Sequence, residues 1–254
     1  MKTAVLALAL LMALPAAAQS PAVVSKESPR WGSFQISLSP FSPNIDSEFT
    51  SSATAPYAAT FGTGRPLMVQ GLFSKSVWTT EVGSLEVGFG AGYWQVWGLG
   101  QYTDAGGTVQ RGGSTSLMII PVQVEATYRV DWFYERWDVP FAPYVRGAIV
   151  DYIWNASGQG GTSSWTSPPT ATPPSTSYRG SGATFGWSAT LGLALVLDFL
   201  DPTLAKQMDY DVGINRTMLF LDFTKSSVSD FGSTKSWQLA PSFWAWSAGL
   251  LFVF

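Results

Sequence analysis

The sequence predicts an all-β protein: an eight-stranded antiparallel transmembrane β-barrel with short periplasmic turns and long extracellular loops. Three observations lead to this prediction. Apolar and polar residues alternate with a period of two along eight segments. The connections between these segments alternate between short and long. The composition is also rich in aromatic residues, at 15%, and has 12% charged residues, against about 25% in typical soluble domains.

The composition also excludes several classes of function. The 254-residue chain has no Cys, so it has no disulfide, thiol nucleophile or thiolate metal site, and it has no His, the commonest general base and metal ligand. A net charge of -3 gives no basic footprint for nucleic acid. The 12 Trp, 16 Phe and 9 Tyr residues exclude a disordered chain. We therefore expect no nucleic-acid partner, no cofactor and no metal.

The N-terminus predicts export. Lys2 provides a positive start, residues 4–14 form an apolar stretch too short to span a bilayer, and Ala16, Ala17 and Ala18 offer a cleavage site before Gln19. Beyond it, no apolar run approaches the roughly 20 residues of a membrane-spanning helix, so only strands could cross a membrane. The expected division is a signal peptide at 1–18, a short periplasmic segment at 19–30 and an outer-membrane barrel at 31–254.

The alternating segments define the expected strands. The clearest runs from 183 to 199, where Phe185, Trp187 and Leu191 share one face and Ser188 and Thr190 share the other. No soluble surface strand needs such an apolar face. The expected strands are 31–39, 66–78, 84–95, 116–130, 141–154, 183–199, 211–224 and 240–254.

The connections favour an outer-membrane barrel with both chain termini on the periplasmic side. They span about 26, five, 20 and ten residues after the first four strands, followed by another long one at 157–182 that is rich in Gly, Ser, Thr and Pro. Asp201 and Pro202 predict the start of a short helix reaching about Met208. Aromatic residues near the strand ends predict interfacial girdles: Trp132, Phe133, Tyr134 and Trp137 at one rim, and Trp94 and Trp97 at the other.

Charged residues within the strands predict a polar network inside the barrel, since an Arg facing lipid at the midplane costs about 2–4 kcal/mol. Arg146 must point inward, and a symmetric hairpin places Glu125 directly opposite, so we expect the two to pair. This lumen network is expected to comprise Glu86, Glu125, Arg129, Arg146, Asp198, Arg216 and Asp222. It could act as a gate or proton path, but a polar plug filling a narrow lumen is favoured.

Three local features have structural interpretations. Turning Arg216 inward sends Asn215 and Thr217 outward, a conflict that a β-bulge could resolve. Gly88, Gly90 and Gly92 share the inward face with Glu86, which leaves space for bulky neighbours or a small cavity, and packing relief is favoured. The acidic pairs Asp46 with Glu48 and Asp209 with Asp211 lack EF-hand spacing and are interpreted as solvated turn residues.

Several motifs carry a family resemblance. They are Pro43-Asn44-Ile45-Asp46-Ser47-Glu48-Phe49, Pro56-Tyr57, Phe61-Gly62, Thr184-Phe185-Gly186-Trp187, Leu200-Asp201-Pro202 and Trp246-Ser247-Ala248-Gly249-Leu250. The chain resembles an uncharacterised outer-membrane β-barrel family of myxobacteria, within the broad class of small OmpA/OmpX-like barrels. The resemblance covers nearly the whole mature chain and implies an outer-membrane location without an activity.

The resemblance also concerns two local features. It implies that Trp246, Phe252 and Phe254, in the aromatic last strand, belong to a signal read by the barrel-assembly machinery. It implies a His where this chain has Arg216, so no role that depends on imidazole carries over.

The leading functional hypothesis is a non-enzymatic outer-membrane protein that anchors surface loops for envelope integrity, adhesion or partner contact. Its expected partners are outer-membrane lipid and the barrel-assembly machinery, and no surface partner is specified. The alternative is a narrow pore for small solutes. A Ser-Lys enzyme is disfavoured because Lys75, Lys225 and Lys235 lie near loops. A soluble lipocalin-type barrel, with its large apolar residues inside, would show the same alternation.

Overall fold

A computed structural model describes residues 29–49, 55–103, 109–166, 177–233 and 236–254. The predicted signal peptide, 1–18, and most of the segment that follows it lie outside the described residues. The described chain folds into a closed antiparallel barrel, which confirms the predicted fold class. Its eight strands are β1 (Gly32–Pro40), β2 (Leu67–Thr79), β3 (Gly83–Thr103), β4 (Val109–Val130), β5 (Phe141–Gly158), β9 (Ser181–Val196), β10 (Arg216–Val228) and β11 (Ala245–Val253).

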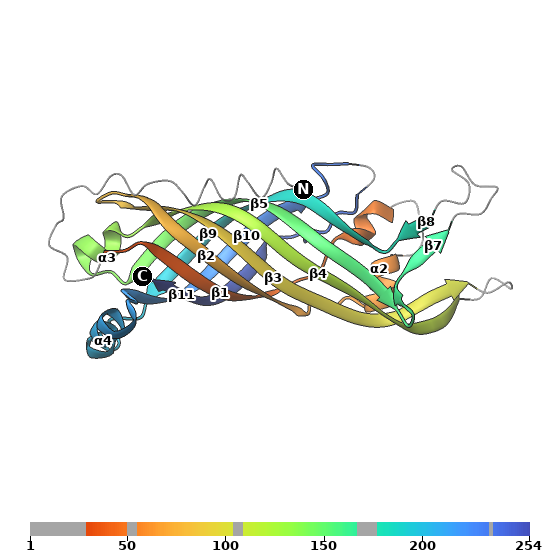
Figure 1. Cartoon of the computed structure of the whole chain (residues 1–254), viewed down its shortest axis with the longest axis horizontal. Helices are drawn as coiled ribbons and strands as arrows, with labels where there is room; N and C mark the ends of the chain where they lie inside the picture. Colours follow the sequence, from red (N-terminus) through yellow and green to blue (C-terminus); the bar gives the residue numbers. More distant parts are fainter. Residues whose placement is uncertain (1–28, 50–54, 104–108, 167–176, 234–235) are drawn as a thin grey trace.

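Every barrel strand pairs with two neighbours, so the sheet has no free side. The first and last strands close it: β1 pairs with β11 from Ser33 opposite Val253 to Leu38 opposite Ala248. We call the end of the barrel where β11 finishes the turn end, and the opposite end the loop end (Figure 1). Closure pairs backbone groups that an open sheet would leave exposed.

The third and fourth strands are longer than predicted and form a projecting arm. The connection expected to span about 20 residues is reduced to residues 104–108, because β3 and β4 continue past their other neighbours. Pairing of β2 with β3 stops at Val69 opposite Tyr93, and pairing of β4 with β5 stops at Ser116 opposite Ser157. Gly98 pairs with Thr115 in this hairpin, and a Cβ at Gly98 would clash with the backbone carbonyl of Thr60, so the glycine allows that segment to approach the arm closely. Figure 1 shows this arm at the loop end.

The region between β9 and β10 differs from the prediction in its boundaries. Helix α4 (Pro202–Val212) is longer than expected, and Asp211 lies in it rather than in a strand. The Asp201 carboxylate caps the helix by accepting hydrogen bonds from the backbone N–H groups of Thr203 and Leu204, both at 3.0 Å. Because β10 begins only at Arg216, it pairs with β11 in a regular register, and the suggested bulge is absent from this pairing.

Further short elements were not predicted. A 3-10 helix η1 (Ile45–Phe49) and helix α2 (Pro56–Phe61) lie at the loop end, and α3 (Trp132–Trp137) lies at the turn end. Asp46, expected to be solvated, accepts hydrogen bonds from the N–H groups of Tyr57 and Ala58 and so holds the start of α2. The Gly- and Ser-rich connection contains β6 (Gly161–Thr162), β7 (Ser164–Thr166) and β8 (Ser177–Arg179). Among the described residues, no helix has the length and hydropathy to span a membrane.

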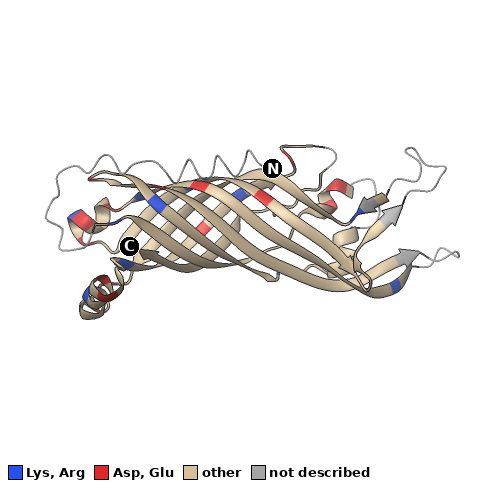
Figure 2. Cartoon of the chain, in the orientation of Figure 1, with Lys and Arg blue, Asp and Glu red and all other residues tan. Residues whose placement is uncertain are grey.

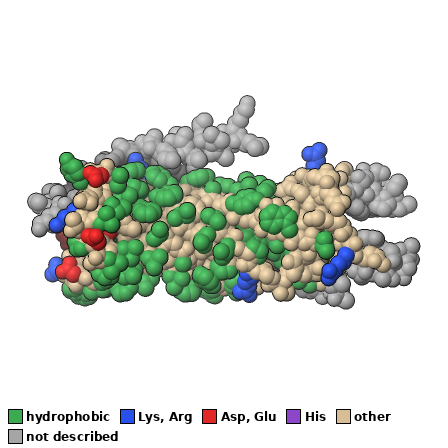
Figure 3. All heavy atoms as spheres, turned by 90° about the horizontal axis from the view of Figure 1, so that it is seen from below, with side chains coloured by type: hydrophobic (Ala, Val, Ile, Leu, Met, Phe, Trp, Pro, Cys, Tyr) green, Lys and Arg blue, Asp and Glu red, His purple; other side chains and the backbone are tan. Residues whose placement is uncertain are grey.

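Large apolar side chains cover the outside of the barrel. Outward positions such as Val145, Ile149, Leu191 and Leu219 are exposed. Figure 3 shows hydrophobic side chains over the wall from the turn end through the middle, with fewer toward the loop end. This distribution is opposite to that of a soluble barrel.

The inside holds two apolar clusters. The turn-end cluster includes Tyr144, Met218 and Leu251, and the loop-end cluster includes Phe41, Trp94 and Leu239. Trp94 is fully buried, with its ring 5.2 Å from that of Phe41, so its predicted position in a girdle is wrong, whereas Trp97 is exposed. Trp94 points inward because it continues the inward face of Glu86, Gly88, Gly90 and Gly92.

Candidate functional site

Several charged residues of the barrel strands point into the barrel, and Figure 2 shows where charged residues lie along the strands. Successive side chains of a strand point to opposite faces, so on β10 Asp222 is buried between the exposed Leu221 and Phe223. Asp151 of β5 and Lys225 of β10 are exceptions, because they share the phase of exposed apolar residues.

The centre of the lumen is organised by Arg146 of β5. Its Nε lies 3.0 Å from Glu125 Oε1 of β4, and its Nη1 lies 3.3 Å from Asp222 Oδ2 of β10. Its Nη2 donates a hydrogen bond to Gln35 Oε1 of β1 at 2.6 Å. One guanidinium therefore connects strands from opposite parts of the barrel. We call Arg146, Glu125, Asp222, Gln35 and Tyr144 the central cluster.

The two carboxylates of the central cluster have additional donors. Glu125 accepts hydrogen bonds from Gln123 Nε2 and Thr127 Oγ1, both at 3.0 Å. Asp222 accepts a hydrogen bond from the Tyr144 hydroxyl. These bonds matter because a buried ion pair stabilises a fold only when the remaining polar atoms are also satisfied.

A second group of charges lies nearer the turn end. Arg129 Nη2 is 2.5 Å from Glu86 Oε1, and Arg129 Nε is 3.2 Å from Asp131 Oδ1. Ser33 Oγ donates a hydrogen bond to Glu86 Oε2 at 2.6 Å, which connects this group to β1. Arg129 and Glu86 are both about as buried as the central cluster.

The turn end itself is closed by α3 and two arginines. The guanidinium of Arg216 lies 4.5 Å from the ring centroid of Tyr134, with Nη2 3.5 Å from Glu135 Oε1. Arg30 approaches the same Glu135 oxygen at 2.9 Å and Asp131 Oδ2 at 3.6 Å. The residues predicted as an aromatic girdle at this rim therefore form a helix that also covers the end of the lumen.

The structure corrects two details of the predicted network. Arg146 lies opposite Thr127, and Glu125 opposite Ala148, so the two charged residues are not directly opposite and meet diagonally. Asp198 lies in the turn after β9, where its Oδ1 accepts a hydrogen bond from the backbone N–H of Thr217 at 3.1 Å. The structure brings Glu125, Arg146 and Asp222 into one cluster. It places Glu86 and Arg129 in the second group and Arg216 at the rim.

Several participants were missed by sequence reasoning. Gln35, Thr127 and Tyr144 lie on inward phases, so strict alternation could have identified them. Asp131 and Glu135 lie in the connection between β4 and β5, where no period indicates direction. Their part in closing the turn end carried no signal in the sequence.

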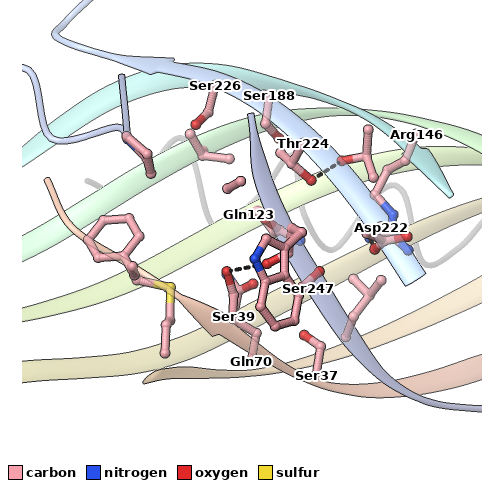
Figure 4. A pocket seen from close by; sticks show the side chains of 18 of the residues that line it. Ser37, Ser39, Gln70, Gln123, Arg146, Ser188, Asp222, Thr224, Ser226 and Ser247 are labelled. Atoms are coloured by element: carbon pink, nitrogen blue, oxygen red, sulfur yellow. Dashed lines mark hydrogen bonds and ion pairs between the residues drawn. The ribbon is translucent and has the colours of Figure 1, made fainter. Parts of the chain in front are cut away.

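A cavity lies next to the central cluster on its loop-end side. The space open to the centres of water molecules is about 70 Å³, enough for several waters at about 10–15 Å³ each. Figure 4 shows its wall of hydroxyl and amide side chains, including Ser37, Gln70, Ser188 and Thr224, with Arg146 and Asp222 at one side. The cavity is polar enough to hold water.

An apolar recess lies farther out, at the loop end. It is lined by residues of η1 and α2 together with Leu117, Ala156 and Trp237. Trp237 stacks on Trp154 with ring centroids 4.9 Å apart. Burial raises the pKa of the Tyr57 hydroxyl in α2 above its ordinary value. In the described part of the chain, no group of three or more acidic residues is placed to hold a metal ion.

One glycine tests how tightly the central cluster is packed. Gly192 of β9 lies between Tyr144 and Asp222 in the sheet, and a Cβ there would clash with both side chains. We expect Gly192→Ala to lower the free energy of unfolding by about 1–3 kcal/mol, measured by urea unfolding in lipid bilayers. Gly147→Ala on β5 is the matched control, because a Cβ there meets nothing within 4 Å. Equal stability of the two variants would contradict the packing.

Comparison with known proteins gives matches to solved structures only. No known protein family matches the chain, and no curated protein matches it in sequence. The N-terminal β-barrel domain of Pseudomonas aeruginosa OprF matches with 13% identity and a TM-score of 0.33, over 88% of this chain and 99% of that one. Ail, the attachment invasion locus protein of Yersinia pestis, matches with 9% identity and a TM-score of 0.37, over 88% of this chain and 97% of Ail. The structure of Ail in complex with the heparin analogue sucrose octasulfate matches with 8% identity and a TM-score of 0.36, over 88% of this chain and 99% of Ail.

Proposed function

We propose that this chain is a non-enzymatic outer-membrane barrel protein that anchors exposed surface structures for envelope integrity, adhesion or partner contact. The observation that carries this proposal is the arrangement of the barrel, with large apolar side chains over its outer wall and ion-paired charged side chains buried in its lumen. Lipid favours this arrangement, because backbone polar groups must be paired within the protein and large apolar side chains face acyl chains.

The N-terminal sequence supports export to that location. Lys2, the apolar stretch and the three consecutive alanines before Gln19 match a secretory signal peptide. The aromatic outward residues of β11, including Trp246 and Phe252, are consistent with recognition by the barrel-assembly machinery. Fractionation of producing cells tests the location: we expect the protein in the outer-membrane fraction, and recovery as a water-soluble protein would contradict the proposal.

The filled lumen supports an anchor over a pore. The central cluster occupies the middle, and the loop-end cluster, with Leu239 and Ala240 from the segment before β11, occupies one end. The cavity between the central cluster and the loop-end cluster, which has room for several waters, is the observation that favours the alternative, a narrow pore. Opening a path would require displacing Arg146 or the loop-end cluster.

Planar bilayers distinguish the anchor from the pore. We expect the purified protein to give no steady single-channel steps at neutral pH, because the Arg146 guanidinium and its partners fill the cross-section. Steady steps from the intact protein would support the pore. An enzyme is tested separately by mass spectrometry of lipids incubated with the protein, where we expect no newly cleaved or transferred acyl chains.

The arm of β3 and β4 is the best candidate for a surface contact. Beyond the pairing of Trp97 with Ser116 it has no strand pairing with β2 or β5, and Leu99 and Arg111 are exposed. Its base is held by hydrogen bonds from the Thr115 hydroxyl to the carbonyl of Ser157 in β5 and from Gln101 Nε2 to a carbonyl of α2, both at 2.9 Å. Exposed strand edges and loops held by a rigid scaffold commonly make contacts with other molecules.

Shortening the arm tests its contribution. Replacing residues 98–115 with Asn-Gly joins Trp97 to Ser116 through a two-residue hairpin and leaves the barrel pairing intact. We expect aggregation of producing cells to fall several-fold, with unchanged resistance to a large hydrophilic antibiotic. Heat-modified migration in gels checks that the variant has folded. Unchanged cell aggregation would show that the arm does not make the surface contact, and loss of antibiotic resistance would show that the arm contributes to envelope integrity.

A further inference from the structure

Helix α4 carries an apolar stripe that the rest of the protein does not cover. Leu204, Met208 and Val212 are four residues apart and therefore lie along one face. Leu204 is 52% exposed and Val212 is 62% exposed, and no residue of α4 is buried. The opposite face presents Lys206 and Tyr210, while Gln207 and Asp211 border the stripe next to Leu204. The helix is thus amphipathic without a protein core to receive its apolar face.

The position of α4 limits what can cover this stripe. The helix stands out beside the barrel at the turn end (Figure 1). Its half-buried residues are Ala205, Met208 and Asp209, so this side is turned toward the rest of the chain. Met208 therefore lies at the edge of this contact, while Leu204 and Val212, on either side of it along the helix, remain exposed.

Exposed apolar side chains lead from the wall to α4. On β9 and β10, Leu193 and Leu219 are exposed on the outer face. In the turn between β9 and α4, Phe199 and Leu200 are also exposed, and Leu204 follows one helical turn after the capping aspartate. Apolar residues thus follow one another from the outer wall up to the start of the helix.

We propose that α4 is an interfacial helix that lies on the phospholipid leaflet at the turn end and inserts Leu204, Met208 and Val212 among the upper parts of the acyl chains. This inference rests on the proposed membrane location of the barrel. Its opposite face, with Lys206 and Tyr210, faces water. The helix thereby fixes the depth of the barrel and resists movement of the turn end into the hydrocarbon.

The charges of α4 indicate which lipid property drives the contact. The helix has one basic residue, Lys206, and two acidic residues, Asp209 and Asp211, while Asp201 lies at its start. Attraction to anionic headgroups needs clustered Lys or Arg, which this helix lacks. Insertion is therefore driven by apolar side chains, requires no anionic lipid and is insensitive to salt.

Labelled single cysteines can locate the helix, because the natural chain contains no Cys. The experiment uses the full-length barrel in phosphatidylcholine nanodiscs, in which both membrane faces are accessible to solutes. Leu204→Cys and Met208→Cys report on the stripe, and Tyr210→Cys, on the opposite face of the same helix, is the matched control. Leu221→Cys, on the exposed outer face of β10, reports on the barrel wall. Each carries the same environment-sensitive fluorophore and is quenched by lipid brominated near the headgroup or by iodide.

We expect lipid quenching at positions 204 and 208 to exceed that at 210 by about threefold or more, with the opposite order for iodide. The pattern should persist in high salt. Equal iodide quenching at 204 and 210, with strong lipid quenching at 221, would overturn the α4 inference and leave the membrane barrel intact. Protection of 204 from both quenchers would also overturn it, by assigning the stripe to a protein contact. Absence of lipid quenching at 221 would overturn the proposed function as well.

Discussion

Replacing Arg146 with Met is expected to lower the free energy of unfolding by about 3–5 kcal/mol. The substitution leaves the carboxylates of Glu125 and Asp222 inside the lumen, where the two residues are 3% and 2% exposed, without the cation that both contact. Gln35 also loses its donor. Urea unfolding and refolding in lipid bilayers, followed by tryptophan fluorescence, measures the loss.

Two further variants test whether the unpaired carboxylates cause this loss of stability. Arg111→Met removes the same side chain from the exposed arm and should change stability by less than about 0.5 kcal/mol. Combining Arg146→Met with Glu125→Gln should cost less than the sum of the single substitutions, because the double variant removes one of the two stranded charges. Strict additivity, or equal effects of the substitutions at 146 and 111, would show that the central cluster does not stabilise the barrel.

Placing Arg at Leu191 is expected to destabilise the barrel by about 2–4 kcal/mol, because the new charge lies in the hydrocarbon region. Leu191 is 57% exposed on the outer face of β9, between strands whose outward residues are also apolar. The measurement is again the free energy of unfolding in phosphatidylcholine bilayers.

Leu99→Arg provides the matched control for this prediction. Leu99 is 44% exposed and also points outward from a strand, but it lies on the arm beyond the barrel wall. We expect its substitution to change stability by less than about 0.5 kcal/mol. A soluble barrel would tolerate Arg equally well at both positions, so equal effects would contradict burial of the wall in lipid.

The direction of the strand side chains was largely predictable, because alternation along a strand is a local property. It placed Arg146 and Asp222 inside and Leu191 outside before any strand partner was known. Strict application of the same rule would also place Trp94 inside, because it is in phase with Glu86. Assigning Trp94 to a girdle gave the general preference of aromatic residues for interfaces too much weight against the phase of its own strand.

The register between strands was less predictable. A symmetric hairpin placed Arg146 opposite Glu125, whereas Arg146 pairs with Thr127. Register depends on the connection, and this connection contains helix α3, so the strand ends alone do not determine it. In addition, the first residue of β5, Phe141, pairs with Leu195 of β9, whereas the pairing of β5 with β4 begins only at Tyr144. The start of β5 therefore does not mark the start of its pairing with β4. The long side chain of Arg146 still reaches Glu125 across the diagonal.

Segments without a repeating pattern could not be placed from the sequence. Leu239 and Ala240 were expected near or at the start of the last strand, but they lie in irregular chain that enters the lumen before β11 begins at Ala245. Asp131 and Glu135 likewise lie in a connection and close the turn end through contacts with Arg30 and Arg216. Such placements depend on which distant side chains are nearby, and no local periodicity encodes that.

The pairing of β1 with β11 has a consequence for folding kinetics. This contact joins segments at opposite ends of the barrel sequence, so its loop-closure entropy is large and the ordering of all the intervening strands must precede or accompany it. A half-formed sheet would leave β1 and β10 with bare hydrogen-bonding edges, which hydrocarbon does not tolerate. In the proposed membrane location, folding and entry into the bilayer would therefore be coupled, with no stable membrane-inserted species of fewer strands.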